Sequence, residues 1–259
     1  MADETRIPLL EFDPTLTAVV EPSVAVSAVD VPRAFVLCFF RDAIDRLVTE
    51  LDGHQITTLE SEMGAHPVFE VRTGDQSVGV ALAGVGAPLA AAWLDELIAR
   101  GARGFVAVGG AGALVPDLAL GHVIVPTAAV RDEGTSYHYA PPSRTIAPTE
   151  DALAAIVATL DRHAIPHLTG LTWTTDGPYR ETRGKVQSRV AEGCLTVEME
   201  AAALFAVARF RGVSLAQMLY AGDDLSGEAW DPRGWQGHAT GRDLLLRLAI
   251  EAALEIGAG

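Results

Sequence analysis

The sequence has few basic residues and only two cysteines. Its 259 residues include 19 Lys and Arg against 34 Asp and Glu. The sequence contains no run of basic residues that could bind along a nucleic-acid backbone. Cys38 and Cys194 lie in apolar segments without metal-ligand spacing, which predicts reduced core residues. The N-terminus lacks a signal-peptide pattern, and no apolar run reaches the ~18 residues of a membrane span. We therefore expect a cytoplasmic protein that binds neither nucleic acid nor membrane.

The hydrophobic content, 49% of the residues, supplies an ample core, and the length suits one α/β domain. The expected strands are 34–40, 78–83, 104–108, 122–125, 171–174, 195–197 and 214–221, and the expected helices are 42–51, 89–100, 201–211 and 241–256. Short strands that are apolar on both faces predict a single-domain, three-layer α/β/α fold with a mixed, mostly parallel central sheet. Residues 1–33, with four prolines, predict an extended arm before the domain of residues 34–259.

Two carboxylates flank a methionine where an apolar strand meets a helix-forming run. Glu198, Met199 and Glu200 stand at this junction, and open α/β sheets bind ligands at the carboxyl ends of their strands. A carboxylate there can accept two hydrogen bonds from a vicinal diol, and the methionine offers an apolar surface, which suits a ribose. The alternative is structural, because the first turn of any helix favours acidic residues. The residues alone leave both interpretations open.

Two more acids follow an apolar strand near the C-terminus. Asp223 and Asp224 follow residues 214–221 after one glycine, Gly222. Burial at a strand exit can raise the pKa of a carboxyl, which makes it a proton donor near neutral pH. The alternative is an aspartate that only shapes a turn.

Six segments, in this order along the chain, resemble the nucleoside phosphorylase and nucleosidase superfamily, whose members cleave the N-glycosidic bond of nucleosides. The segments are 84–88, 108–114, 121–134, 174–179, 196–203 and 222–224. The resemblance runs from about residue 34 to the C-terminus. It implies a nucleoside phosphorylase-like fold, a small-molecule nucleoside as substrate, no resident cofactor or metal, and a homo-oligomer that is a dimer or a trimer of dimers.

The resemblance also implies roles for the acidic residues. Glu200 would bind the ribose hydroxyls, with Met199 and Glu198 on the same site. Asp223 stands where purine-cleaving relatives donate a proton to N7, which favours a purine-like base. Asp224 would take that role if the alignment slipped by one residue.

The base pocket departs from the family pattern. Tyr179 is present, but Pro178 stands where the family often stacks an aromatic ring on the base. Thr182 and Gly184 occupy the places of two base-binding residues of the uridine-specific enzymes, with Arg183 between them. Tyr179 and Arg183 are therefore the candidate base contacts, and the identity of the base does not carry over.

The phosphate side departs further. Phosphorylases of the family hold phosphate with a Gly-Asp-Pro turn followed by an arginine, but residues 39–43 read Phe-Phe-Arg-Asp-Ala. A second family arginine corresponds to Ala107. A third family arginine, which a neighbouring subunit contributes, corresponds to a position near residues 62–69, and this stretch contains no arginine. Phosphate needs positive charge or several directed N–H donors, so ordinary phosphorolysis would require a rebuilt site.

Three hypotheses for the activity remain. Phosphate is a candidate co-substrate if Arg41 or Arg46 supplies the charge and the loop at Gly109 and Gly110 supplies N–H groups. Water would replace it in a nucleosidase, with Glu62 or Glu70 to position it. A non-catalytic nucleoside-binding protein is the third alternative.

Overall fold

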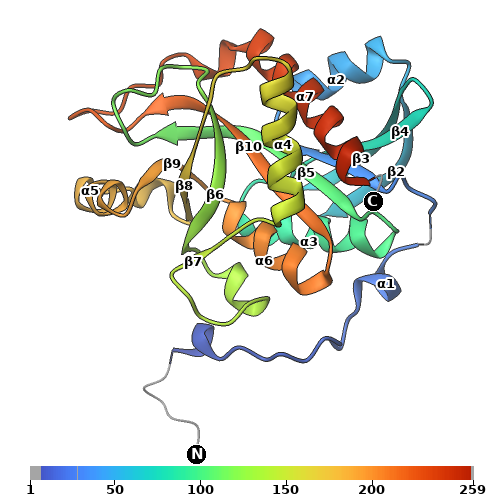
Figure 1. Ribbon diagram of the computed structural model, residues 1–259. Helices are drawn as coiled ribbons and strands as arrows, with labels where there is room; N and C mark the ends of the chain where they lie inside the picture. Colours follow the sequence, from blue (N-terminus) through green and yellow to red (C-terminus); the bar gives the residue numbers. More distant parts are fainter. Residues whose placement is uncertain (1–6, 28, 258–259) are drawn as a thin grey trace, which may run out of the picture.

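Ten strands form one mixed sheet in the computed structural model, which describes residues 7–27 and 29–257 (Figure 1). The strands are β1 (Ala34–Cys38), β2 (His54–Ser61), β3 (Gly64–Thr73), β4 (Gln76–Leu82), β5 (Gly104–Ala113), β6 (Val123–Asp132), β7 (Thr145–Ile146), β8 (His167–Thr175), β9 (Cys194–Glu198) and β10 (Ser214–Asp224). The α-helices are α1 (Pro22–Ala25), α2 (Arg41–Glu50), α3 (Ala87–Ala99), α4 (Glu150–Arg162), α5 (Arg183–Ala191), α6 (Ala201–Arg211) and α7 (Ala239–Gly257). Short 3₁₀ helices span η1 (Pro8–Leu10), η2 (Thr135–His138), η3 (Pro178–Arg180) and η4 (Trp235–Gly237).

Helices cover both faces of the sheet, which confirms the predicted three-layer arrangement. Alternate strand residues point to opposite faces. On one face Leu37, Phe105 and Leu215 pack with α3 and α6 in one buried cluster. On the other face, Val36 and Val106 pack with α2, α4 and α7. Both faces are apolar, so the central strands have the continuous hydrophobic runs by which the sequence predicted them.

The topology gathers several chain segments at one edge. β5 pairs in parallel with β1 and with β10, so the carboxyl ends of all three strands meet there. β9 pairs with the last residues of β5 in the opposite direction, Gly112 facing Val197. The pairings β5–β10–β6–β8–β9–β5 form a closed ring. The ring brings the end of β9 and the start of α6 next to the ends of β1, β5 and β10.

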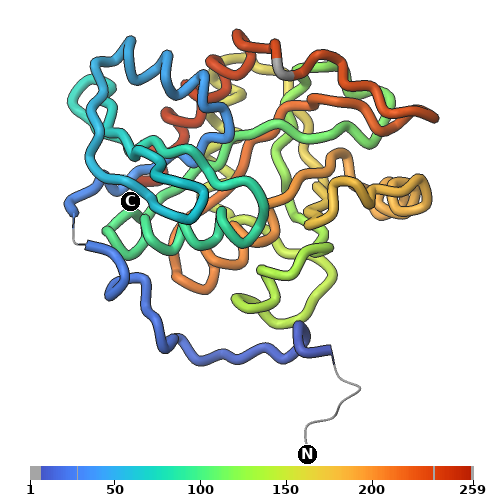
Figure 2. The backbone as a smooth tube through the Cα atoms, turned by 180° about the vertical axis from the view of Figure 1, so that it is seen from behind, coloured from blue at the N-terminus to red at the C-terminus, as the bar shows by residue number. Residues whose placement is uncertain are grey.

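The N-terminal arm runs along the outside of the domain, from η1 to α1 (Figures 1 and 2). Glu21 pairs with Arg211 at 3.7 Å, and Arg100 donates to the carbonyl of Ser27 at 3.2 Å. Residues 1–6 and 28 of the expected arm, and residues 258–259 of the expected domain, lie outside the described residues. The oligomer that the resemblance implies stays a prediction.

Candidate active site

A cavity of about 790 Å³ opens where β1, β5 and β10 end and β9 meets α6. Its volume is typical of a small-molecule site. Of the residues that the sequence singled out, six line it: Tyr179, Glu198, Met199, Glu200, Asp223 and Gly110. Four others lie outside its lining: Arg41, Gly109, Arg183 and Asp224. The segment Glu198–Glu200 and Asp223 therefore share one cavity.

Glu198 ends β9 and caps α6. Its Oε2 accepts hydrogen bonds from the backbone N–H groups of Glu200 at 2.7 Å and Ala201 at 2.6 Å, and its Oε1 accepts one from the Thr174 hydroxyl at 2.6 Å. The two backbone N–H groups would otherwise be unpaired donors at the start of α6. Burial still raises the pKa of Glu198 overall. The structural interpretation of an acid at this junction therefore applies to Glu198, although its side chain also borders the cavity.

Glu200 has fewer partners and faces the cavity. Its Oε1 accepts one hydrogen bond, at 2.6 Å, from the backbone N–H of Gly86, which lies just before α3. The residue is only 6% exposed. Burial, and then the charge of Glu198, raise the pKa of Glu200. The carboxyl is thus fixed by one oxygen and leaves acceptor capacity for a ligand hydroxyl, with Met199 as its apolar neighbour.

Asp223 lies at the outer end of β10 and contacts the loop that follows. Its Oδ2 accepts a hydrogen bond from the indole Nε1–H of Trp230 at 2.7 Å. Trp230 is 62% exposed, yet it lines the cavity. An indole N–H can only donate, so it holds the carboxyl group of Asp223 in place while one side of the indole ring stays open to solvent.

Asp224 is turned away from the cavity. It pairs with Arg233 and accepts a hydrogen bond from the backbone N–H of Ser226 at 2.8 Å. Burial raises the pKa of Asp224, but these partners outweigh it and the pKa is lowered. Asp224 is therefore an ionised loop anchor, and Asp223 is the acid of the two that borders the cavity.

The segment before α5 forms another wall. Tyr179 lines the cavity with its side chain almost fully exposed, so no described residue packs over the ring. Arg183 points instead to the loop after β10, where its Nη1 donates to the carbonyl of Leu225 at 2.9 Å. This contact holds the wall to the strand end that carries Asp223. Glu181, which the sequence analysis did not single out, lines the same wall.

Burial, and then the charge of Asp223, raise the pKa of Glu181 to about 7. The unfolded chain should titrate near its ordinary value of 4.5, so this group leaves the folded state most stable below that pH, where Glu181 is neutral in both states. That stability is lost as the pH rises through about 7, because the buried carboxyl must then ionise. We expect Glu181→Gln to raise Tm relative to the wild type at about pH 8 and to change it little at about pH 5. Thermal melts at both pH values test this. The exposed Glu228→Gln is the control, and an equal shift at both pH values would contradict the assignment.

Two of the three phosphate-side candidates, Arg41 and Gly109, lie apart from the cavity. Arg41 is exposed, and its Nη2 lies 3.2 Å from Nδ1 of His66 on β3. Gly109 is covered by Phe39, whose ring leaves no room for a side chain there. Gly110 does border the cavity. The two acids considered for positioning water, Glu62 and Glu70, belong to the β2–β3 hairpin and are absent from the described cavity wall.

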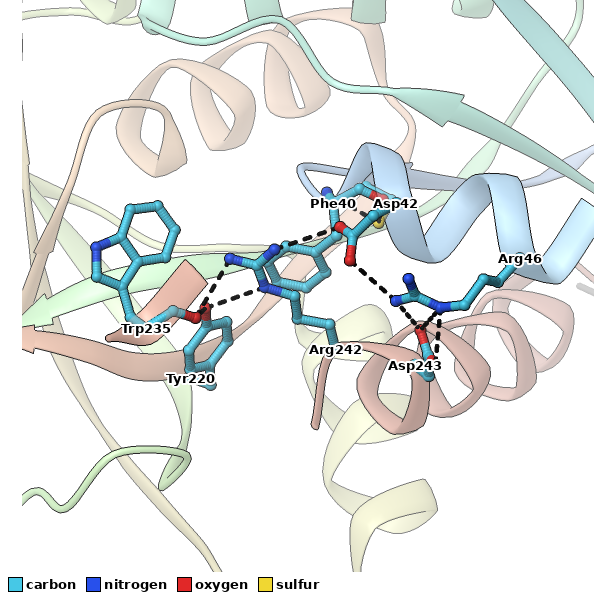
Figure 3. A network of polar contacts seen from close by, with 8 residues as sticks. Phe40, Asp42, Arg46, Tyr220, Trp235, Arg242 and Asp243 are labelled. Carbon is cyan, nitrogen blue, oxygen red and sulfur yellow. Dashed lines mark hydrogen bonds and ion pairs between the residues drawn. The ribbon is translucent and has the colours of Figure 1, made fainter. Parts of the chain in front are cut away.

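Arg242 of α7 is the one cationic side chain in the described cavity wall. Figure 3 shows its polar contacts. Its guanidinium lies 5.1 Å from the ring centre of Phe40 and 5.4 Å from that of Trp235. Nε donates to the Tyr220 hydroxyl at 3.3 Å and Nη2 to the Trp235 carbonyl at 3.4 Å. Nη1 pairs with Asp42 at 3.3 Å. The charge of Arg242 is thus already partnered within the protein.

The sequence analysis missed Arg242, although a signal was present. Residues 245, 249 and 252 form the buried stripe of α7, and Arg242 continues that stripe by one turn. A charged residue on the apolar stripe of a helix marks a buried polar contact. Asp42, the carboxylate partner of Arg242, also pairs with Arg46, and Arg46 in turn pairs with Asp243 at 2.6 Å (Figure 3).

The described residues give no indication of a metal site or a membrane span. No group of three or more His, Cys, Asp and Glu side chains in residues 7–27 and 29–257 is arranged to hold a metal ion. Within the same ranges, every helix is too short or too polar to cross a bilayer.

Three comparisons place this architecture among known proteins. The uridine phosphorylase of Treponema pallidum is 31% identical over 186 residues, which are 68% of this chain and 71% of that protein. A crystal structure of Vibrio fischeri uridine phosphorylase superimposes with a TM-score of 0.75 at 27% identity, covering 86% of this chain and 92% of that one. An AMP nucleosidase of Bacteroides thetaiotaomicron shares the fold, with a TM-score of 0.69 at 22% identity over 86% and 87% of the two chains. Residues 34–242 match the model of the phosphorylase superfamily, and the chain belongs to that family.

Proposed function

We propose that this chain cleaves the N-glycosidic bond of a nucleoside with a purine-like base, and that water rather than phosphate attacks C1′. The polar lining of the cavity carries the proposal. Four carboxyl groups and one guanidinium line it: Glu181, Glu198, Glu200, Asp223 and Arg242. Carboxyl oxygens near the sugar stabilise the positive charge that develops on it as the bond breaks. A single guanidinium offers little charge to an incoming dianion.

The sugar end of the cavity is formed by the β9–α6 junction. The free oxygen of Glu200 is positioned to accept hydrogen bonds from the ribose hydroxyls, beside the apolar surface of Met199. Its hydrogen bond from Gly86 fixes the carboxyl before substrate arrives. A group held in advance near developing charge stabilises the transition state without reorganisation.

The base end of the cavity holds Asp223. In this proposal Asp223 donates a proton to the leaving base, as the resemblance to purine-cleaving relatives implies. A proton delivered to N7 turns the base into a neutral leaving group. Trp230 is hydrogen-bonded to the carboxyl group of Asp223 and lines the cavity beside it. In this proposal its indole ring borders the base and limits the contact of the base with water.

The charges available where the nucleophile would bind favour water over phosphate. Moving a phosphate dianion from water into a closed site without a paired charge costs roughly several kcal/mol of free energy. Arg242 already pairs with Asp42 and donates to two neutral oxygens. The positions that hold phosphate in the phosphorylases are not cationic here, and Arg41 lies outside the cavity. Phosphorolysis, the alternative, would have to free Arg242 from its present partners.

Product analysis on a panel of purine and pyrimidine nucleosides, with and without phosphate, tests the proposal. We expect free base and free pentose from purine nucleosides, at a rate that phosphate does not raise. Ribose 1-phosphate as the sugar product would establish a phosphorylase with a rebuilt site. Binding of nucleosides without release of base would establish the non-catalytic alternative.

A further inference from the structure

Gln217 is a buried amide in the wall of the cavity that no step of the proposed reaction has used. It lies in β10, is 1% exposed, and borders the cavity. Its Oε1 has no hydrogen-bond partner among the described residues. A buried amide oxygen without a partner is unfavourable in a folded protein, and it is normally satisfied by a ligand or an ordered water.

The register places Gln217 on the ribose side of the cavity. Gln217 is paired with Ala107 of β5, whose methyl group packs on the sheet face that α3 and α6 cover. Glu200 is the N-cap residue of α6, which covers that same face. Gln217 is therefore on the side of Glu200, whereas Arg242 enters from α7 on the opposite face.

Gln217 and Asp223 both line the cavity from β10. Asp223 is six residues further toward the open end, and strand residues advance by roughly 3.3 Å each. The proposed proton donor to the base thus lies further out along β10 than Gln217. The nearby lining residues from the ends of β1 and β5 are Phe39, Phe40 and Gly110, which carry no charge. The guanidinium of Arg242 lies beside Phe40, but it is paired with Asp42.

We propose that Gln217 holds the water molecule that attacks C1′. The amide oxygen accepts one hydrogen from water, which leaves an oxygen lone pair free to point at the sugar. This inference rests on the proposed hydrolytic function. A neutral amide with an unfilled acceptor suits a nucleophile that carries protons, and it offers no charge to a phosphate dianion.

The step balances without any further reactant. The water oxygen forms a bond to C1′ as the bond from C1′ to the base nitrogen breaks, and the electron pair of that bond goes to the base. Asp223 protonates the base, and the proton that the attacking water loses restores Asp223 through solvent. Gln217 neither gains nor loses a proton, because its role is to orient the water.

Gln217→Met tests the proposal, since methionine has nearly the same shape without hydrogen-bonding capacity. We expect kcat to fall by about 10- to 100-fold with KM for the nucleoside little changed, because misplacing a reactant costs about that much. In mixtures of water and methanol, the ratio of methyl riboside to free ribose should rise above that of the wild type, because the variant no longer selects water. A merely structural glutamine would move neither kcat nor this ratio.

Two further variants keep the test decisive. Thr159→Val removes another unpartnered buried polar atom, in α4 and outside the cavity, and should leave kcat and the methanol ratio unchanged. Gln217→Asn keeps the amide but withdraws it by one methylene, and should show the same changes if the methionine variant fails to fold. Unchanged kcat and methanol ratio in folded Gln217 variants would overturn the assignment. Ribose 1-phosphate from the wild type would overturn the hydrolytic function itself, which is a distinguishable result.

Discussion

Replacing Glu200 with glutamine is expected to lower kcat/KM by about two orders of magnitude or more, because an amide has one acceptor oxygen and Gly86 occupies it. No acceptor is then left for the ribose hydroxyls as charge develops in the transition state. Glutamine has the same shape and can still accept the hydrogen bond from Gly86. The variant should therefore fold normally. Steady-state kinetics on the best purine nucleoside of the panel, with a thermal melt of the same preparation, measures both effects.

Glu198→Gln is the matched control, because the same change two residues earlier should act mainly on stability. An amide has one acceptor oxygen, whereas Glu198 accepts hydrogen bonds on both of its oxygens from Thr174, Glu200 and Ala201. Leaving such donors unpaired costs about 1–3 kcal/mol, so Tm should fall. Normal turnover by Glu200→Gln, or a fall in its Tm like that of Glu198→Gln, would remove Glu200 from the ribose site.

The fold was predictable where a segment is buried on both faces. The strand at Ala34–Cys38 is an unbroken apolar run because both sheet faces are covered there. The hairpin of β2 and β3 was missed, because its strands alternate polar and half-buried residues at the open edge of the sheet and resemble a loop in composition. The antiparallel pairing of β9 with β5 depends on contacts between segments far apart in the chain, which periodicity does not encode.

The candidate site was predictable where neighbouring residues in sequence form it. Glu198, Met199 and Glu200 lie together because a strand ends where a helix begins. The sequence could not divide their roles, since only the fold shows Glu198 capping α6 and Glu200 facing the cavity. Gln217 and Glu181 escaped notice because a single glutamine in a strand or a glutamate before a helix is ordinary. Their position beside the cavity follows from the register and the tertiary contacts.

Asp223→Asn is expected to reduce kcat/KM on purine nucleosides by about 10²- to 10⁴-fold, the range of a lost proton transfer. Asparagine keeps an oxygen for the indole N–H of Trp230, so the loop should stay in place. Asp224→Asn is the control, because Asp224 faces Arg233 and Ser226 rather than the cavity. Its loss of activity should be much smaller, and any effect on Tm should come from the weakened ion pair.

A substrate whose base already carries a positive charge at N7 separates proton donation from other roles of Asp223. When a purine nucleoside is alkylated at N7, its base can leave without receiving a proton. The Asp223→Asn variant should therefore cleave it at a rate close to that of the wild type. If the variant is equally slow on this substrate, Asp223 orients the base or the sugar instead of protonating it. If Asp224→Asn is the inactive variant, the register that the resemblance assigns to this segment is displaced by one residue. The acid would then have to reach the cavity by breaking its contact with Arg233.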